Sequence, residues 1–190
     1  MNTLEFARDL PQGKATGVWR WTRHAIALGP LVLAVRDAGL AGIWFDGQRH
    51  FDGPEPGWTR DDDDPLLRET VQQLDDWCAG RRRDFALRLA PVGTPFQLTV
   101  WRGLCDIGHG ERLSYGALAG RLGKPLASRA VGAATGRNPI SLVIPCHRLV
   151  GDKGALTGYA GGLARKAALL DFESGQRALT WDDAAVEALA

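Results

Sequence analysis

The segment Ile144-Pro145-Cys146-His147-Arg148 contains the residues of this chain whose types and spacing could do chemistry. A cysteine becomes a strong nucleophile when a nearby base or cation favours its thiolate, and His147 and Arg148 follow Cys146 directly. Pro145 cannot donate to a sheet, so Cys146 is expected on a turn. Neighbouring side chains of an extended stretch point opposite ways, so His147 would reach the sulfur only across a turn or through a water. A lone Cys-His pair is more often structural than catalytic, so this segment alone does not establish a catalytic site.

The other two cysteines, Cys78 and Cys105, predict no further chemistry. An odd number of widely spaced cysteines argues against a disulfide framework and against a four-ligand zinc site. Cys78 ends a series of apolar residues at helical spacing, and Cys105 lies beside the apolar face of another expected helix. Both are expected to be packing thiols, and no metal or cofactor is expected.

The residues before position 93 are predicted to form an antiparallel sheet and one helix. Three short strands are expected at His24–Leu28, Leu31–Arg36 and Leu40–Phe45. The turns between them are expected at Gly29-Pro30 and at Asp37-Ala38-Gly39. A loop rich in Gly, Pro and Asp follows at 46–63. One more strand is expected at Phe85–Leu89.

Helix-start signals then recur along the chain. Asp64-Pro65 predicts a helix that runs to Gly80, and Thr94-Pro95 predicts another through Ile107. Further helices are expected at Ser114–Leu122, at about Ala127–Gly136, at Leu163–Phe172, and as a short one from Asp182. The pair joined by Gly123-Lys124-Pro125-Leu126 has the proportions of a helix-turn-helix. Ser141–Ile144 is expected to be a strand and Gly151–Gly154 a hairpin-like turn.

The charge of the chain is unevenly distributed. The 190 residues have a formal net charge of +1, 45% hydrophobic and 24% charged residues, which is typical of a globular domain. Residues 101–170 carry a net charge of +7, while the segments before and after them are acidic. Nineteen of the basic residues are arginines and four are lysines, which suits phosphate contact but also follows from a GC-rich genome. No transmembrane run or signal peptide is recognisable, so a cytoplasmic location is expected.

Six motifs together identify a family. They are Ser114-Tyr115-Gly116, Ser128-Arg129-Ala130-Val131-Gly132, Asn138-Pro139, Ile144-Pro145-Cys146-His147-Arg148, Gly158-Tyr159-Ala160-Gly161-Gly162 and Glu173. Over roughly residues 94 to 173 the chain closely resembles the O6-alkylguanine-DNA alkyltransferases. The resemblance implies an α+β fold: a strand-rich domain at 1–92, a DNA-binding and catalytic domain at 93–175, and an acidic tail at 176–190.

The resemblance also implies an activity. Cys146 would accept an alkyl group from O6 of guanine, and from O4 of thymine, once and irreversibly. His147 would take the thiol proton through a water, and Glu173 would orient His147. Tyr115 would donate a hydrogen bond to the ring nitrogen N3.

The remaining site residues implied by the resemblance bind or position the DNA. Arg129 would fill the space of a nucleotide flipped out of the duplex, and Asn138 would tie the helix-turn-helix to the cysteine. Arg148 would hold the active-site turn, and Ala160 stands where some relatives have a serine that binds O6. The other expected substrate contacts are made by Ser128, Tyr159 and the main chain near Leu149.

Three functions remain open at this stage. The chain could be a single-use alkyltransferase, a non-catalytic relative that binds alkylated guanine and recruits repair factors, or a cysteine hydrolase or helix-turn-helix regulator with an accidental match. Non-catalytic relatives replace the acceptor cysteine, which is present here as Cys146. The expected partner is double-stranded DNA containing O6-alkylguanine, bound by a monomer. No cysteine precedes Cys78, so the zinc site of some relatives cannot be built.

Overall fold

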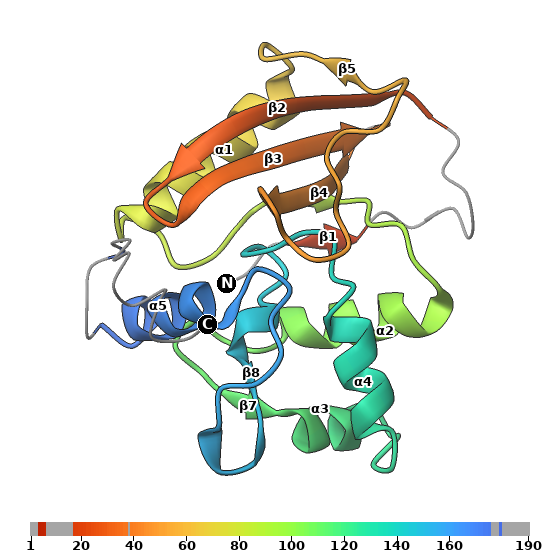
Figure 1. Cartoon of the computed structure of the whole chain (residues 1–190), viewed down its shortest axis with the longest axis vertical. Coiled ribbons are helices and arrows are strands. Elements are labelled where there is room, and N and C mark those ends of the chain that lie inside the picture. The colour runs from red at the N-terminus through yellow and green to blue at the C-terminus, as the bar shows by residue number, and fades with distance from the viewer. Residues whose placement is uncertain (1–3, 7–16, 38, 176–178, 180–190) are drawn as a thin grey trace.

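A six-stranded sheet and a group of helices form two halves that pack directly on each other (Figure 1). The computed structural model describes residues 4–6, 17–37, 39–175 and 179. The sheet has the order β1-β6-β4-β3-β2-β5. Its strands are β1 (Glu5–Phe6), β2 (Trp19–Ile26), β3 (Gly29–Arg36), β4 (Gly39–Phe45), β5 (Thr59–Arg60) and β6 (Arg88–Leu89).

The predicted antiparallel meander is confirmed by β2, β3 and β4, with two corrections. The first strand begins at Trp19, and the turn after it lies at Ala27-Leu28, because Gly29 and Pro30 already pair with Ile26 and Ala25. The expected three-stranded sheet is wrong in its extent, since β1, β5 and β6 add parallel pairings at its margins. Strands of two residues are too short to give a periodic signal in the sequence.

The predicted helix starts are confirmed by their caps. In α1 (Pro65–Cys78), the Asp64 carboxylate accepts hydrogen bonds from two backbone amides of the first turn. In α2 (Pro95–Cys105), Thr94 and Gln97 form a reciprocal capping box. Ser114 caps α3 (Tyr115–Arg121), which is followed by α4 (Ser128–Thr135) and later by α5 (Leu163–Glu173).

One predicted strand, at 141–144, is wrong, and two other predicted features differ in detail. Residues 141–144 wind through turns, with Leu142 at φ +72°, although all four side chains are buried. The strand expected at Phe85–Leu89 shortens to β6, and 152–154 form a 3₁₀ turn, η2 (Asp152–Gly154). A short apolar run shows that a segment is buried but does not distinguish a strand from a buried turn.

The sheet supports the segment that leads to the cysteine. The Ile43 amide in β4 donates to Pro139 O (2.9 Å), and the Ser141 amide donates to Ile43 O (2.9 Å). One hydrophobic core contains side chains from both sides of residue 92. The helix expected from Asp182 lies outside the described residues. In the part of the chain described, no helix has the length and hydrophobicity required to cross a membrane.

Candidate active site

Cys146 lies at the start of a 3₁₀ turn, η1 (Cys146–Arg148), immediately before β8 (Leu149–Val150). Strand β8 pairs in parallel with β7 (Leu113–Ser114), so the turn is held at the end of a short sheet that also begins α3. The Cys146 side chain is 5% exposed. Its sulfur accepts a hydrogen bond from Asn138 Nδ2 at 3.0 Å.

Asn138 closes the loop between α4 and the cysteine. Its Nδ2 also donates to Ile144 O at 2.8 Å, and its Oδ1 accepts from the Ile140 amide at 3.0 Å. The side chain is buried, so these partners replace the water that a free amide would bind. One side chain therefore fixes both the turn from 138 to 146 and the direction of the sulfur.

Glu173, the last residue of α5, accepts hydrogen bonds from the two basic side chains that follow Cys146 and from one backbone amide. Its Oε1 accepts from His147 Nε2 (3.0 Å) and Arg148 Nη2 (2.8 Å), and its Oε2 accepts from Arg148 Nε (2.9 Å) and the Gly110 amide (3.3 Å). Burial alone would raise the pKa of the Glu173 carboxyl, but His147 and Arg148 hold that pKa far below its usual value. Glu173 is therefore a buried carboxylate that is hydrogen-bonded to His147.

Burial and nearby charges determine the protonation states of Cys146 and His147 before any reaction. Burial raises the pKa of the Cys146 thiol, against the hydrogen bond from Asn138 and the charge of Lys166. Burial also lowers the pKa of His147, against the attraction of Glu173. The resting pair is a thiol and a neutral imidazole, assigned here with its Nε2–H donated to Glu173. His147 Nδ1 is then the free acceptor, and this buried atom has no protein partner.

A pocket of about 810 Å³ opens beside the cysteine. Five of the predicted site residues line it, namely Tyr115, Ser128, Arg129, Tyr159 and Ala160. Cys146 is not among the lining residues. Burial raises the pKa of both Tyr115 and Tyr159, and a charge on the Cys146 sulfur would raise both further. The thiol is therefore within electrostatic range of the two tyrosines that line the pocket.

The other six predicted site residues do not line this pocket: they are Cys146, His147 and Glu173, described above, and Asn138, Arg148 and Leu149. Asn138 and Arg148 are buried in the contacts around Cys146 and Glu173. Leu149 is fully buried, and its backbone pairs with Leu113 in the small sheet. The structure thus brings Asn138 and Arg148 to the nucleophile and leaves the Leu149 side chain in the core.

Lys166 is a functional candidate that the sequence did not single out. Its side chain is fully buried, and its Nζ donates to Thr157 O (2.6 Å) and Gly158 O (3.4 Å). The Tyr115 hydroxyl donates to the same two carbonyls at 3.2 Å. Burial lowers the pKa of Lys166 to about 8, against the attraction of Cys146. No local sequence signal distinguishes Lys166 from an exposed lysine of this helix.

Fewer basic side chains of residues 101–170 are exposed, and so available for contact with DNA, than the net charge of this segment implied. Arg148 and Lys166 are buried, and Arg165 is partly buried and donates to Leu28 O and Gly161 O. These cations hold the protein together rather than project from it. Two basic residues outside this segment, Arg49 and His50, line the pocket instead.

The other cysteines are packing residues, as predicted. Burial raises the pKa of the Cys78 thiol to about 11 and that of Cys105 to about 12, so neither forms a thiolate at neutral pH. Within the residues described, no group of three or more His, Cys, Asp or Glu side chains could hold a metal ion.

Comparison with known proteins assigns the family. The model for the DNA-binding domain of 6-O-methylguanine DNA methyltransferase matches residues 95–175. The methylated-DNA–protein-cysteine methyltransferase of Methanosarcina acetivorans is 43% identical over 147 residues, covering 77% of this chain and 92% of that protein. The chain belongs to the methylated-DNA–protein-cysteine methyltransferase family. The Mycobacterium leprae member is 42% identical over 149 residues, covering 78% of this chain and 88% of that protein.

The fold agrees with this family. The crystal structure of Mycobacterium tuberculosis OGT in complex with DNA matches with a TM-score of 0.77 at 37% identity, covering 89% of this chain and 98% of that one. The match extends well beyond the DNA-binding domain, so the sheet of residues 19–60 belongs to the family fold as well. Both the sheet and the helical part of the family fold are therefore present in this methyltransferase family member, and the buried Cys146 lies in the helical part.

Proposed function

We propose that this protein repairs DNA by direct reversal, transferring the alkyl group from O6 of guanine to Cys146 in a single irreversible turnover. One observation carries the proposal: the Cys146 thiol, bound by Asn138 and followed by the His147–Glu173 pair, is within electrostatic range of two tyrosines that line a pocket whose rim carries Arg129. O4-alkylthymine is a second expected substrate. The acceptor would be consumed, because a thioether on Cys146 has no route to hydrolysis in such a site.

The proposed reaction is a displacement at carbon. The Cys146 sulfur attacks the alkyl carbon, the bond from that carbon to O6 breaks, and its electron pair passes into the guanine ring. The thiol proton moves through a water to His147 Nδ1, and the carboxylate of Glu173 stabilises the imidazolium that forms. Tyr115 exchanges its hydrogen bonds to the 157–158 carbonyls for one to N3 and transfers its phenolic proton there, so guanine leaves neutral. The thiol proton held by His147 then restores the phenol through water.

The target nucleotide must leave the duplex, because a thiol that is 5% exposed cannot reach a stacked base. Helix α4 is proposed to enter the minor groove, where the exposed Arg129 takes the place of the extruded nucleotide. Ser128 and Arg129 form the rim on α4, and Tyr159 and Ala160 form the wall on the opposite loop. Cys146 and Leu149 would read the base edge through their main chain.

The non-catalytic alternative is supported less well. It needs the pocket and the DNA-binding helix but no nucleophile, and it gives no reason for the Asn138 donor on the Cys146 sulfur or for the His147–Glu173 pair. The intact protein mass after incubation with a duplex containing O6-methylguanine separates the two. We expect one added methyl group, on Cys146, and saturation at one equivalent. An unchanged mass with retained DNA binding would favour the alternative, and turnover beyond one equivalent would contradict a single-use reaction.

Arg129→Ala tests the extrusion step. We expect the variant to lose at least tenfold more repair rate on duplex DNA than on free O6-benzylguanine, because a free base needs no extrusion. Arg68→Ala, on the exposed surface of α1, is the matched control. Equal losses on the two substrates would remove this role from Arg129.

The organisation of the chain completes the proposal. We propose that residues 93–175 form the DNA-binding and catalytic domain, that 1–92 form a supporting domain, and that 176–190 form an acidic tail. The family match at 95–175 supports the first boundary. The protein is proposed to act as a monomer, and in the cytoplasm because its substrate is DNA.

A further inference from the structure

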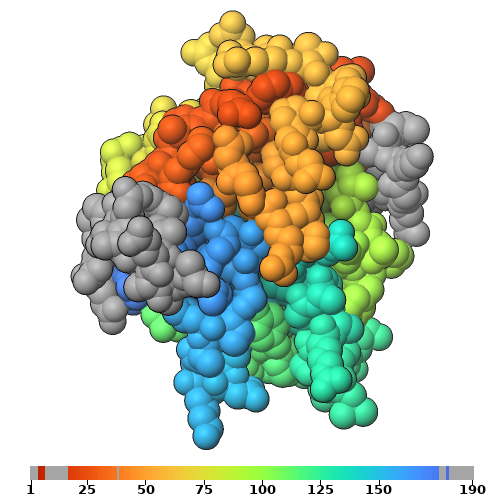
Figure 2. All heavy atoms as spheres, in the orientation of Figure 1, coloured from red at the N-terminus to blue at the C-terminus, as the bar shows by residue number. Residues whose placement is uncertain are grey.

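The loop between β4 and β5 extends from the sheet half to the mouth of the base pocket. The Arg49 amide donates to Ala160 O at 3.0 Å, and Gln48 Oε1 accepts from Ser141 Oγ at 3.0 Å. Figure 2 shows this loop (orange) descending to the hollow between α4 (teal) and the segment around residue 155 (blue). Arg49 and His50 are therefore held against the catalytic half, although they belong to the strand-rich half.

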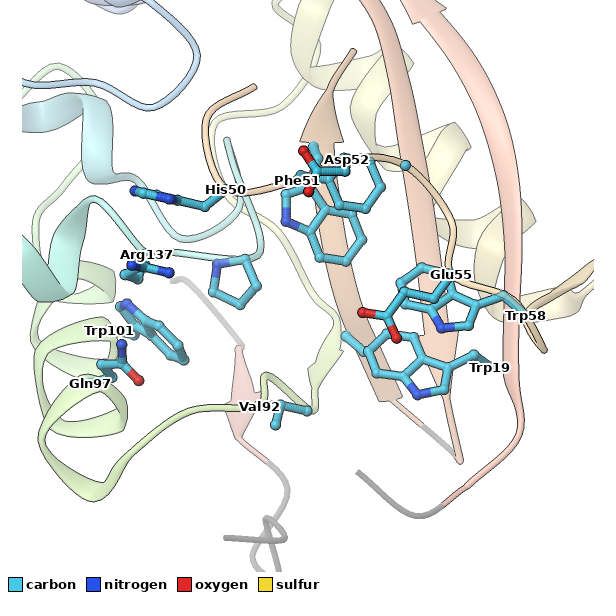
Figure 3. A pocket seen from close by; sticks show the side chains of 14 residues that line it. Trp19, His50, Phe51, Asp52, Glu55, Trp58, Val92, Gln97, Trp101 and Arg137 are labelled. Atoms are coloured by element: carbon cyan, nitrogen blue, oxygen red, sulfur yellow. The ribbon is translucent and has the colours of Figure 1, made fainter. Parts of the chain in front are cut away.

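Three basic side chains meet there without an acidic partner. Arg49, His50 and Arg137 all line the base pocket, and His50 and Arg137 also line an adjoining pocket of about 780 Å³. Figure 3 shows His50 and Arg137 on the same side of that second pocket. The ion pairs found among the described residues include none of the three.

The like charges interact with one another. Burial makes the largest contribution to lowering the pKa of His50, and the positive charges of Arg137 and Arg49 lower it further. Asp152 lines the base pocket, and Asp52 and Glu55 line the second pocket, but none of them forms an ion pair with these three basic side chains. Grouping cations in this way costs free energy unless an anion joins them.

The backbone of His50 adds a second cost. Its φ is +70°, in the left-handed region that residues with side chains seldom occupy. Hydrogen bonds on both sides hold it there, from the Arg49 amide to Ala160 O and from the Phe51 amide to Gln48 O. Such strained positions concentrate at functional sites.

We propose that Arg49, His50 and Arg137 form a binding site for one phosphodiester of the DNA strand next to the extruded nucleotide. The proposal rests on the proposed function and adds the sheet half of the chain to the DNA interface. Arginine forks match phosphate oxygens in pairs, and the imidazole supplies a third donor. The site lies where the base pocket meets the adjoining pocket, so a strand whose base enters the first passes its phosphate over the junction.

The salt dependence of binding to a duplex that contains O6-methylguanine, measured in a Cys146→Ser background, tests the charge contacts. The double variant Arg49→Ala/Arg137→Ala is expected to reduce the slope of log K against log salt by about 0.9, the value for one phosphate, and each single variant by less. Arg68→Ala is the control, because this exposed arginine lies on α1, away from both pockets. Slopes of the single and double variants equal to those of wild type and the control would overturn the proposal.

Neutral methylphosphonate linkages, placed one at a time around O6-methylguanine, locate the phosphate. In a Cys146→Ser background, we expect binding to weaken at one or two linkages next to the lesion. With Arg49→Ala and Arg137→Ala added, the same linkages should cause no further loss, because the contact is already absent. Identical losses at every linkage with and without the arginines would contradict the site.

The alkyl-transfer assay separates this proposal from the one on which it rests. If wild type gains no methyl group but the salt slopes fall as expected, the proposed function fails and the anion site stands. If wild type is methylated and the slopes do not change, the anion site alone fails.

Discussion

Asn138 is the one side chain that donates a hydrogen bond to the reactive sulfur, among the residues described. Asn138→Asp keeps the shape but replaces the donor with a carboxylate beside a buried thiol. The Cys146 pKa, already raised by burial, should rise by at least about one further unit. Below that pKa the thiolate fraction falls tenfold per unit, so alkylation by free O6-benzylguanine should slow about tenfold or more. The rate, measured from pH 6 to 10.5, should level off at a higher pH than in wild type.

Gln97→Glu is the matched control for Asn138→Asp. It makes the same amide-to-acid change in the exposed capping box of α2, far along the chain from Cys146. Its pH profile should follow that of wild type. A profile for Asn138→Asp that coincides with both would show that the hydrogen bond does not influence the thiol.

The site residues differ in how far the sequence predicts them. Cys146, His147 and Arg148 are adjacent in the chain, and the motif around them identifies the nucleophile directly. Lys166 looks like any basic residue of the final helix, and only the packing of α5 against the 157–158 loop buries it. Arg49 and His50 lie in a loop with no motif, so their approach to the pocket depends on the β4 contacts with residues 139–141. Long-range contacts of this kind leave no local pattern.

Helix α5 buries a charge at each end of one apolar stripe. Its buried residues are Lys166, Leu169, Leu170 and Glu173, which lie on one helical face. Lys166→Met removes the donor to the 157–158 carbonyls but fills the same volume. We expect the repair rate to fall by about 10- to 100-fold, because the pocket wall and Tyr115 lose a shared anchor. Lys153→Met, on an exposed 3₁₀ turn, should retain the wild-type rate.

The same lysine makes a distinct prediction for stability. Its folded pKa of about 8 lies below its unfolded value of 10.5, so the folded state binds fewer protons between these values. The Lys166 contribution to the free energy of unfolding should therefore increase from about pH 8 to 10.5 and be constant below that window. Denaturation of wild type and Lys166→Met across pH 7 to 10.5 should show wild type gaining stability relative to the variant. A constant difference would show that the buried amine does not titrate in this window.

At the scale of elements, caps were predicted well and buried turns poorly. Asp64, Thr94 and Ser114 accept hydrogen bonds from amides two or three residues on, so a local sequence signal suffices. The turn at 141–144 is stabilised by Asn138 and by Ile43, one of them almost a hundred residues away. Its apolar sequence therefore favoured a strand that the distant contacts do not permit.

The whole molecule should unfold as one unit, because one core and a set of backbone hydrogen bonds cross the boundary between its halves. Gln48→Ala tests this junction, since the buried Gln48 side chain accepts from Ser141 Oγ and the Phe45 amide. Leaving these donors unpaired costs about 1–3 kcal/mol, or roughly 2–12 °C in Tm for a chain of this size. Calorimetry should show a single transition for each protein, with the transition of Gln48→Ala shifted as a whole to lower temperature. Two separate transitions, with only one displaced by Gln48→Ala, would instead show that the halves fold independently and that the sheet does not brace the cysteine.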